Sequence, residues 1–210
     1  MRDLRLEDLD LSIVPAFILR DRIWQECMRW ATQGRGKEQR YGALCIRGRE
    51  ILGGGRSRLL GRNEPFPYKT SYFLHAESAA LGAALLNLQS QASTNSVDVS
   101  GATIYWAGFL VKDRIPLIRR AGFENMCSCV RCPALLTRFG VNLAIMTEHG
   151  WNLFTGEENL FYAKKNAKLI RERNLSTTEF RRIICLSSTS KRSTCALPAK
   201  YDAELLSAPS

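Results

Sequence analysis

The chain has 210 residues, the size of one ordinary globular domain and short for two. Hydrophobic residues make up 45% and charged residues 24%, values that exclude a disordered, collagen-like or coiled-coil chain. Thirty Lys and Arg residues against twenty Asp and Glu give a formal net charge of +10, which favours an anionic partner such as a phosphate, a nucleotide or a nucleic acid.

Seven cysteines are present, and three of them, Cys127, Cys129 and Cys132, fall within six residues. An odd number with this crowding is not typical of a disulfide framework and favours metal binding. The first ten residues mix acids and bases, and no apolar segment with a cleavage site follows, so no signal peptide is predicted. No apolar run reaches the roughly 18 residues that a membrane span needs. We therefore expect no membrane contact and a reducing, cytoplasmic location.

The first half of the chain predicts a helix, a hairpin and a second helix. Apolar residues at helical spacing within residues 12–31 indicate an amphipathic helix. Residues 41–46 and 51–55 read as two strands joined by the turn RGRE, and the glycine run 53–55 would let the backbone approach another group closely. A run of small residues that begins near His75 predicts the next helix, which should end before residues 89–99.

Strands and helices continue to alternate in the second half. Residues 103–106 and 140–147 are predicted strands, residues 157–172 a surface helix, and residues 182–186 a last strand. Alternation of this kind predicts an α/β fold with one sheet covered by helices. We expect one domain over residues 1–188, with its core at about 40–150, and a flexible tail over 189–210.

Two short motifs carry the chemistry. The first is His75-Ala76-Glu77 at a predicted helix start, and the second is Cys129-Val130-Arg131-Cys132 at another. Cysteines three apart share one face of a helical turn, so both thiolates can reach one ion. One histidine and two cysteines are three protein ligands, the number of a catalytic zinc site whose fourth position stays open for water. Glu77 could then accept a proton from that water and pass it to a leaving amine.

An H-x-E motif followed by C-x-x-C resembles the signature of the cytidine/deoxycytidylate deaminase superfamily. The hairpin YGALCIRGREILGGG before HAE and the strand GATIYW before the cysteines stand in the order that this superfamily uses. The resemblance implies a mixed β-sheet flanked by helices and Zn²⁺ bound by His75, Cys129 and Cys132, with Glu77 as the catalytic proton shuttle. It also implies homo-oligomers, because members of the superfamily often associate.

The sequence departs from that pattern in two places, Ser128 where proline is usual and a long insertion at about 108–126. Ser57 aligns near a position where many relatives have asparagine. Trp106 and Phe109, at the end of the strand before the cysteines, could line a base pocket. These three residues are the candidate substrate contacts.

The implied activity is hydrolytic deamination of a nucleobase, with cytosine in a nucleotide or nucleoside the first hypothesis. Residues 20–69 carry twelve basic and five acidic side chains, which keeps open an alternative in which the substrate is cytosine or adenine within single-stranded DNA or RNA. A further alternative is a noncatalytic zinc-containing module that binds nucleic acid, with Cys127 as a fourth ligand that closes the site.

Overall fold

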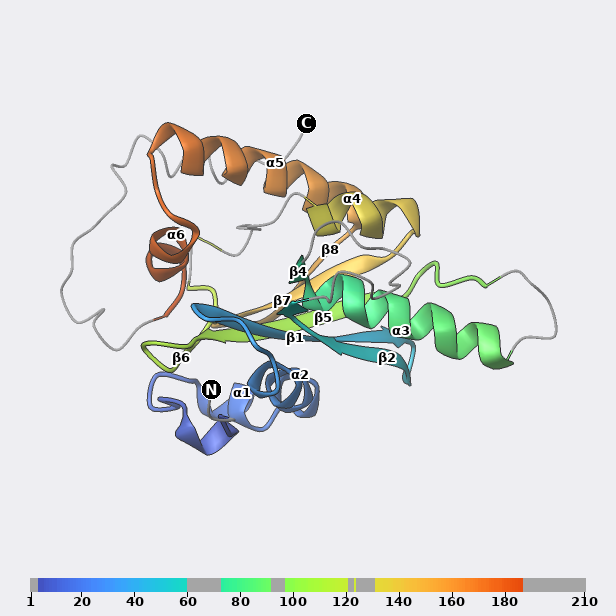
Figure 1. The fold of residues 1–210 in the computed structure, drawn as a ribbon, viewed down its shortest axis with the longest axis horizontal. Helices are drawn as coiled ribbons and strands as arrows, with labels where there is room; N and C mark the ends of the chain where they lie inside the picture. Colours follow the sequence, from blue (N-terminus) through green and yellow to red (C-terminus); the bar gives the residue numbers. More distant parts are fainter. Residues whose placement is uncertain (1–3, 60–72, 92–96, 121–122, 124–130, 187–210) are drawn as a thin grey trace.

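The computed structural model describes residues 4–59, 73–91, 97–120, 123 and 131–186, and it has a six-stranded mixed sheet between helices (Figure 1). The predicted α/β fold is confirmed. The main sheet contains β1 (Gln39–Arg47), β2 (Glu50–Arg56), β5 (Thr103–Leu110), β6 (Ile115–Pro116), β7 (Asn142–Thr147) and β8 (Gly150–Phe154). A separate ladder pairs β3 (Arg58–Leu59) with β4 (Phe73–Leu74). The helices are η1 (Leu6–Asp8), α1 (Ala16–Leu19), α2 (Arg22–Thr32), α3 (Ala76–Gln91), α4 (Arg131–Arg138), α5 (Gly156–Glu172) and α6 (Thr177–Ile184).

The direction of the strands brings the starts of two helices to one end of the sheet. The strand order is β2-β1-β5-β7-β8, with β6 paired to β5. Both β2 and β5 run antiparallel to β1, and β7 runs parallel to β5, so β2, β5 and β7 share one direction. Because α3 and α4 connect these strands, their N-termini lie near the carboxyl ends of the strands, the end where open α/β sheets usually bind ligands.

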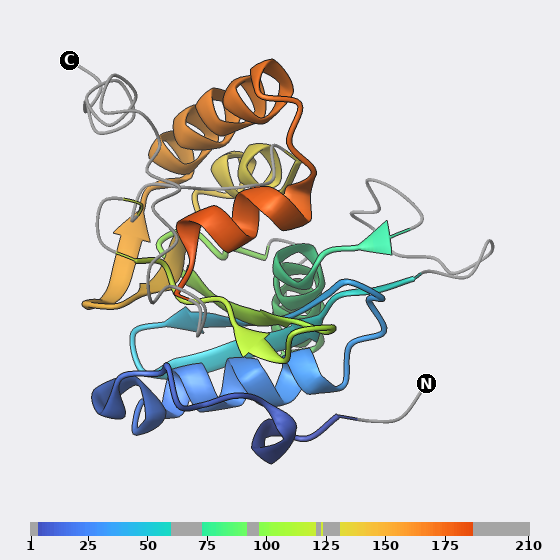
Figure 2. The same ribbon diagram turned by 90° about the vertical axis from the view of Figure 1, so that its left-hand side faces the viewer.

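The two faces of the sheet have different helical covers, as the two perpendicular views show (Figures 1 and 2). One core packs α2 against the sheet through residues such as Trp24, Met28 and Leu44. The other packs α3 against the opposite face through Ala80, Ala84 and neighbouring apolar side chains. Successive strand residues therefore alternate between an α2 face and an α3 face.

The N-terminal helix is broken in two, because Asp21 caps a new helix by accepting a hydrogen bond from the backbone N–H of Trp24 at 2.8 Å. Helices at 76–91, 131–138 and 156–172 and strands over 39–56, 103–110 and 142–147 agree with the sequence-based elements. The insertion 108–126 includes the end of β5 and the short strand β6. Within the described residues, no helix is both long and apolar enough to cross a membrane.

Further elements differ from the sequence-based expectation. The strand predicted at 182–186 is wrong, because α6 occupies Thr177–Ile184 and only an isolated bridge joins Cys185 to Arg119. The sequence analysis also missed β8, β6 and the short ladder of β3 and β4. The tail expected at 189–210 lies outside the described residues.

Candidate metal centre

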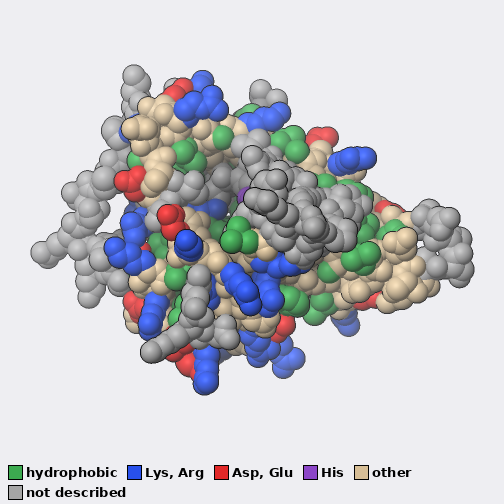
Figure 3. All heavy atoms as spheres, in the orientation of Figure 1, with side chains coloured by type: hydrophobic (Ala, Val, Ile, Leu, Met, Phe, Trp, Pro, Cys, Tyr) green, Lys and Arg blue, Asp and Glu red, His purple; other side chains and the backbone are tan. Residues whose placement is uncertain are grey.

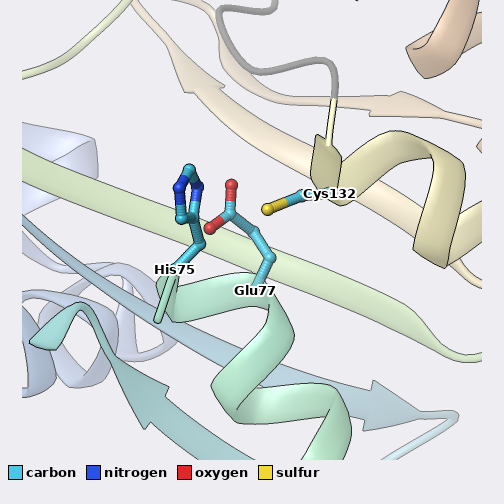
Figure 4. A group of neighbouring side chains, drawn as sticks. All are labelled: His75, Glu77 and Cys132. Carbon is cyan, nitrogen blue, oxygen red and sulfur yellow. The ribbon is translucent and has the colours of Figure 1, made fainter. Parts of the chain in front are cut away.

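Three of the side chains singled out by the sequence meet at the carboxyl end of the sheet. One ligand atom each from His75, Glu77 and Cys132 lies within 4.8 Å of both others. Figure 4 shows the imidazole, the carboxylate and the thiol pointing toward one another, the first two from the start of α3 and the thiol from the start of α4. Residues 57 positions apart in the sequence are thus brought to one point by two separate helix starts.

The helix starts explain how these side chains converge. His75 directly precedes α3 and its carbonyl accepts a hydrogen bond from the Ala79 N–H at 3.0 Å, so it belongs to the first turn. Because the backbone is still irregular there, His75 and Glu77 can point the same way although they are only two residues apart. Ser78 lies between the helices, with its hydroxyl 3.7 Å from the Cys132 sulfur.

The three side chains of the candidate metal centre differ in their exposure to solvent. Glu77 is 8% exposed and Cys132 only 2%, whereas His75 is half-buried. An imidazole and a thiol are donors that suit Zn²⁺, and a neighbouring carboxylate can either coordinate or exchange protons. The donor set therefore fits a zinc ion. Cys129, predicted as a further ligand, and Cys127, the alternative fourth ligand, lie outside the described residues.

The glycine run of β2 sets the distance between α3 and the sheet. A Cβ atom on Gly55 would lie 2.4 Å from the Ala80 backbone nitrogen, and one on Gly53 would lie 2.5 Å from the Ala84 nitrogen. Side chains at these two positions would collide with helix backbone, which cannot rotate away. The glycines thus allow the close approach that the sequence analysis anticipated, and they fix the height of α3 above the sheet.

Trp106, a candidate substrate contact, lies on the α3 face and is 4% exposed. Its ring stacks on Tyr41 with 4.9 Å between centroids, and the guanidinium carbons of Arg119 and Arg181 lie 5.4 and 5.2 Å from the ring centroid. Arg181 also lies over Tyr41, at 4.9 Å. The tryptophan is thus part of a buried aromatic and cationic cluster, with cation–π contacts of about 1–2 kcal/mol each.

The charge of Glu77 reaches this cluster. Burial raises the pKa of Tyr41 above its ordinary value, the guanidiniums of Arg181 and Arg119 oppose that shift, and Glu77 adds to it. Burial lowers the pKa of Arg181, while Glu77 acts to raise it. The charge of Glu77 thus acts on the pKa of both side chains, although less than burial does.

The other two candidate substrate contacts lie elsewhere. Phe109 is completely buried in the α2-side core, the opposite face of the sheet from Trp106 and α3. Ser57 is buried at the end of β2, where its hydroxyl accepts a hydrogen bond from the Tyr41 N–H at 3.1 Å. The structure brings neither side chain into the group formed by His75, Glu77 and Cys132.

Sequence reasoning missed Tyr41, Arg119 and Arg181. Arg119 is fully buried and its Nη1 donates to the Cys185 sulfur at 2.7 Å, while Arg181 is 4% exposed. Both arginines stand beside apolar residues, in the stretches IPLIRRAGF and EFRRIICL. An arginine within an apolar stretch is a signal of a buried cation that pairs or stacks, and it could have pointed to this cluster.

Comparisons with known proteins give distant matches only. No family model matches the sequence, and no curated protein matches it significantly. Among solved structures, the apo dCMP deaminase of the cyanophage S-TIM5 matches with a TM-score of 0.27 and 17% identity, over 48% of this chain and 60% of that chain. The same deaminase in complex with dCMP and dUMP matches with a TM-score of 0.26 and 18% identity over the same shares. The match thus spans less than two thirds of the deaminase's length.

Proposed function

We propose that the protein is a zinc-dependent hydrolytic deaminase of the cytidine/deoxycytidylate deaminase superfamily, which converts cytosine to uracil in a nucleotide or nucleoside. The observation that carries the proposal is the convergence of His75, Glu77 and Cys132, with ligand atoms within 4.8 Å of one another. The proposal is supported by the proximity of His75 and Glu77 to Cys132, which is far from them in the sequence.

In this proposal His75, Cys132 and Cys129 hold the ion. Two thiolates and a neutral imidazole balance the charge of Zn²⁺ and leave a fourth position open. A zinc ion held by these residues would lower the pKa of a bound water to about 7 and would so supply hydroxide at neutral pH. Glu77 does not bind the ion in this proposal, and its carboxylate transfers the proton.

Glu77 would accept a proton at a carboxylate oxygen and donate it to the amine as the bond between the ring carbon and nitrogen breaks. Water supplies the oxygen of the new carbonyl, ammonia leaves, and no oxidant or reductant is needed. The buried Glu77 carboxylate lies beside the ligand atoms of His75 and Cys132, and this position supports the role, because proton transfer requires a donor and an acceptor within hydrogen-bond reach. Trp106, on the same face of the sheet, is proposed to line the base pocket.

Replacement of Glu77 by glutamine tests the proposal, since glutamine has nearly the same shape and cannot shuttle a proton. We expect the zinc content and the fold of Glu77→Gln to match the wild type, and the release of ammonia from dCMP or cytidine to fall by about 10²–10⁴-fold. The exposed Glu157→Gln is the matched control. Uracil detected by mass identifies the product.

Two results would contradict the proposal. One is deamination by Glu77→Gln at the wild-type rate. The other is a zinc-loaded wild type that turns over no cytosine nucleoside, nucleotide or oligonucleotide, as expected for a noncatalytic binding module.

A further inference from the structure

A serine hydroxyl lies against the sulfur of the candidate metal centre. The Ser78 Oγ is 3.7 Å from the Cys132 Sγ, and the two residues belong to different helices, α3 and α4. Sulfur is a weak acceptor and a larger atom than oxygen, so hydrogen bonds to it are longer than those to oxygen. The contact therefore joins the first turns of the two helices directly beside Glu77.

Both partners of this contact are shielded from solvent. Ser78 is 1% exposed and Cys132 is 2% exposed. In such a setting a hydrogen bond is electrostatically stronger than in water. Loss of the hydroxyl would leave a gap of one small group, which is too narrow for a water molecule to replace it.

The position of Ser78 in α3 explains why its hydroxyl faces the neighbouring helix. A serine within a helix often donates to the carbonyl of a residue one turn earlier. Ser90, near the other end of α3, does so, with its hydroxyl 2.7 Å from the Asn87 carbonyl oxygen. Ser78 lies in the first turn, where the His75 carbonyl accepts a hydrogen bond from the Ala79 N–H at 3.0 Å. Its hydroxyl is directed across to α4 instead.

Metal binding would decide which atom of this pair donates. A cysteine thiol can donate or accept, and either atom could be the donor in this contact. A cysteine that binds a metal is a thiolate, which can only accept. The Ser78 hydroxyl must then donate to Cys132, and a hydrogen bond to an ionised acceptor is roughly twice as strong as one between neutral groups.

We propose that Ser78 is a positioning residue of the candidate metal centre, whose hydroxyl donates to the Cys132 sulfur, orients it toward the ion and so strengthens zinc binding. Groups that hold a metal ligand in place in this way typically contribute about 10–100-fold to metal affinity. The inference adds a residue to the site and rests on the zinc ion of the proposed function.

The bound ion can be assigned to this site by a separate variant. Among the described residues, His75, Glu77 and Cys132 form the group of His, Cys, Asp or Glu side chains that could hold a metal ion. Figure 3 shows the Asp and Glu side chains of one face scattered rather than gathered. We therefore expect His75→Ala to lose the zinc, which identifies the ion that is measured.

The test compares the zinc affinity of Ser78→Ala with that of the wild type, by competition with a chelator of known affinity and without substrate. Alanine is smaller than serine and the best helix former, so the variant is expected to fold. We expect its zinc affinity to fall by about 10–100-fold. Ser78→Thr keeps the hydroxyl and should bind zinc more tightly than Ser78→Ala. Ser90→Ala removes a hydroxyl from the same helix and is the matched control.

Cobalt in place of zinc gives a second readout. A thiolate bound to Co²⁺ produces an absorption band in which charge moves from sulfur to the metal. A hydrogen bond stabilises the lone pairs of the sulfur, so its loss in Ser78→Ala should shift the band to longer wavelength. A purely structural role for Ser78 would change the Tm of the metal-free protein and leave the band where it is.

The proposal is overturned if Ser78→Ala binds zinc as tightly as the wild type, or if Ser90→Ala weakens zinc binding equally. An unshifted cobalt band in Ser78→Ala also contradicts it. Ammonia release from dCMP is measured separately. A wild type that binds zinc and shows the effect of Ser78 but releases no ammonia contradicts the proposed function and supports this inference. A wild type that deaminates dCMP without any effect of Ser78 on zinc binding does the reverse.

Discussion

Replacement of Gly55 by alanine tests whether the contact between β2 and α3 positions the candidate metal centre. The added Cβ would lie 2.4 Å from the Ala80 nitrogen and 2.5 Å from the Ala79 Cβ, whereas ordinary contacts begin at 3.4 Å. Because the nearest atom is helix backbone, the strand and the helix must separate by about 1 Å. The first turn of α3 carries His75 and Glu77, so both would move relative to Cys132.

Two losses are expected from Gly55→Ala. Overpacking of this kind costs about 1–3 kcal/mol, or roughly 2–12 °C in Tm for a chain of this length. A misplacement of about 1 Å at a reacting centre can cost on the order of 100-fold in rate. We therefore expect a folded variant with weakened zinc binding and strongly reduced ammonia release, measured at a temperature where it is fully folded.

Gly54→Ala is the matched control, because the same substitution on the adjacent residue faces α2. Its Cβ would lie 2.7 Å from the Trp30 ring, on the opposite side of the sheet from Glu77. We expect it to lower Tm but to keep zinc affinity and activity. Wild-type activity of Gly55→Ala, or an equal loss of activity in both variants, would refute the reasoning.

Two further predictions concern the cysteines. Burial raises the pKa of Cys45 from 9.0 to about 12, so the thiol stabilises the fold below pH 9 and this contribution is lost as the pH rises toward 12. Chemical denaturation from pH 8 to 11 should show a falling free energy of unfolding, with a shallower fall in Cys45→Ala; an identical pH dependence in both proteins would contradict this. Cys129→Ser should lose zinc and Cys127→Ser should retain it, as measured by metal analysis; loss of zinc from both variants would favour the closed site, in which Cys127 is a fourth ligand.

The sequence predicted the sheet and the convergence of His75 with Cys132 for separate physical reasons. A chain in which strands and helices alternate can adopt only a few topologies, which predicts the sheet. Helices that connect parallel strands start at the same end of the sheet, which predicts the convergence. Any side chain at the start of such a helix is therefore directed to that end. For this reason two short motifs were sufficient to bring three side chains together without knowledge of the loops.

The alternation of side chains along a strand could have shown that Trp106 and Phe109 do not line the same pocket. Trp106 and Phe109 are three residues apart on β5, so their side chains point to opposite faces and cannot line one pocket. The sequence analysis predicts a strand at 103–106 followed by an insertion from about residue 108, whereas β5 extends to Leu110. A Cβ on Gly108 would lie 2.2 Å from the Tyr41 ring, so the glycine continues the strand under that ring.

The helix α6 was mistaken for a strand because a short apolar run does not distinguish the two. Ser176 and Glu179 form a capping box, in which the Glu179 N–H donates to the Ser176 hydroxyl at 3.2 Å and the Ser176 N–H donates to the Glu179 carboxylate at 2.8 Å. This S-x-x-E pattern precedes the apolar run and favours a helix start. The contacts of Arg181 with the rings of Tyr41 and Trp106 are tertiary and have no local signature.

The candidate ligands come from two helices that follow different strands of the sheet. An ion held by His75 and Cys132 would therefore link the first turns of α3 and α4. The backbone connects these two helices only through β5 and the chain after it. Binding energy of this kind is also folding energy. The metal would then stabilise the fold as well as take part in catalysis, and its release would destabilise the first turns of both helices.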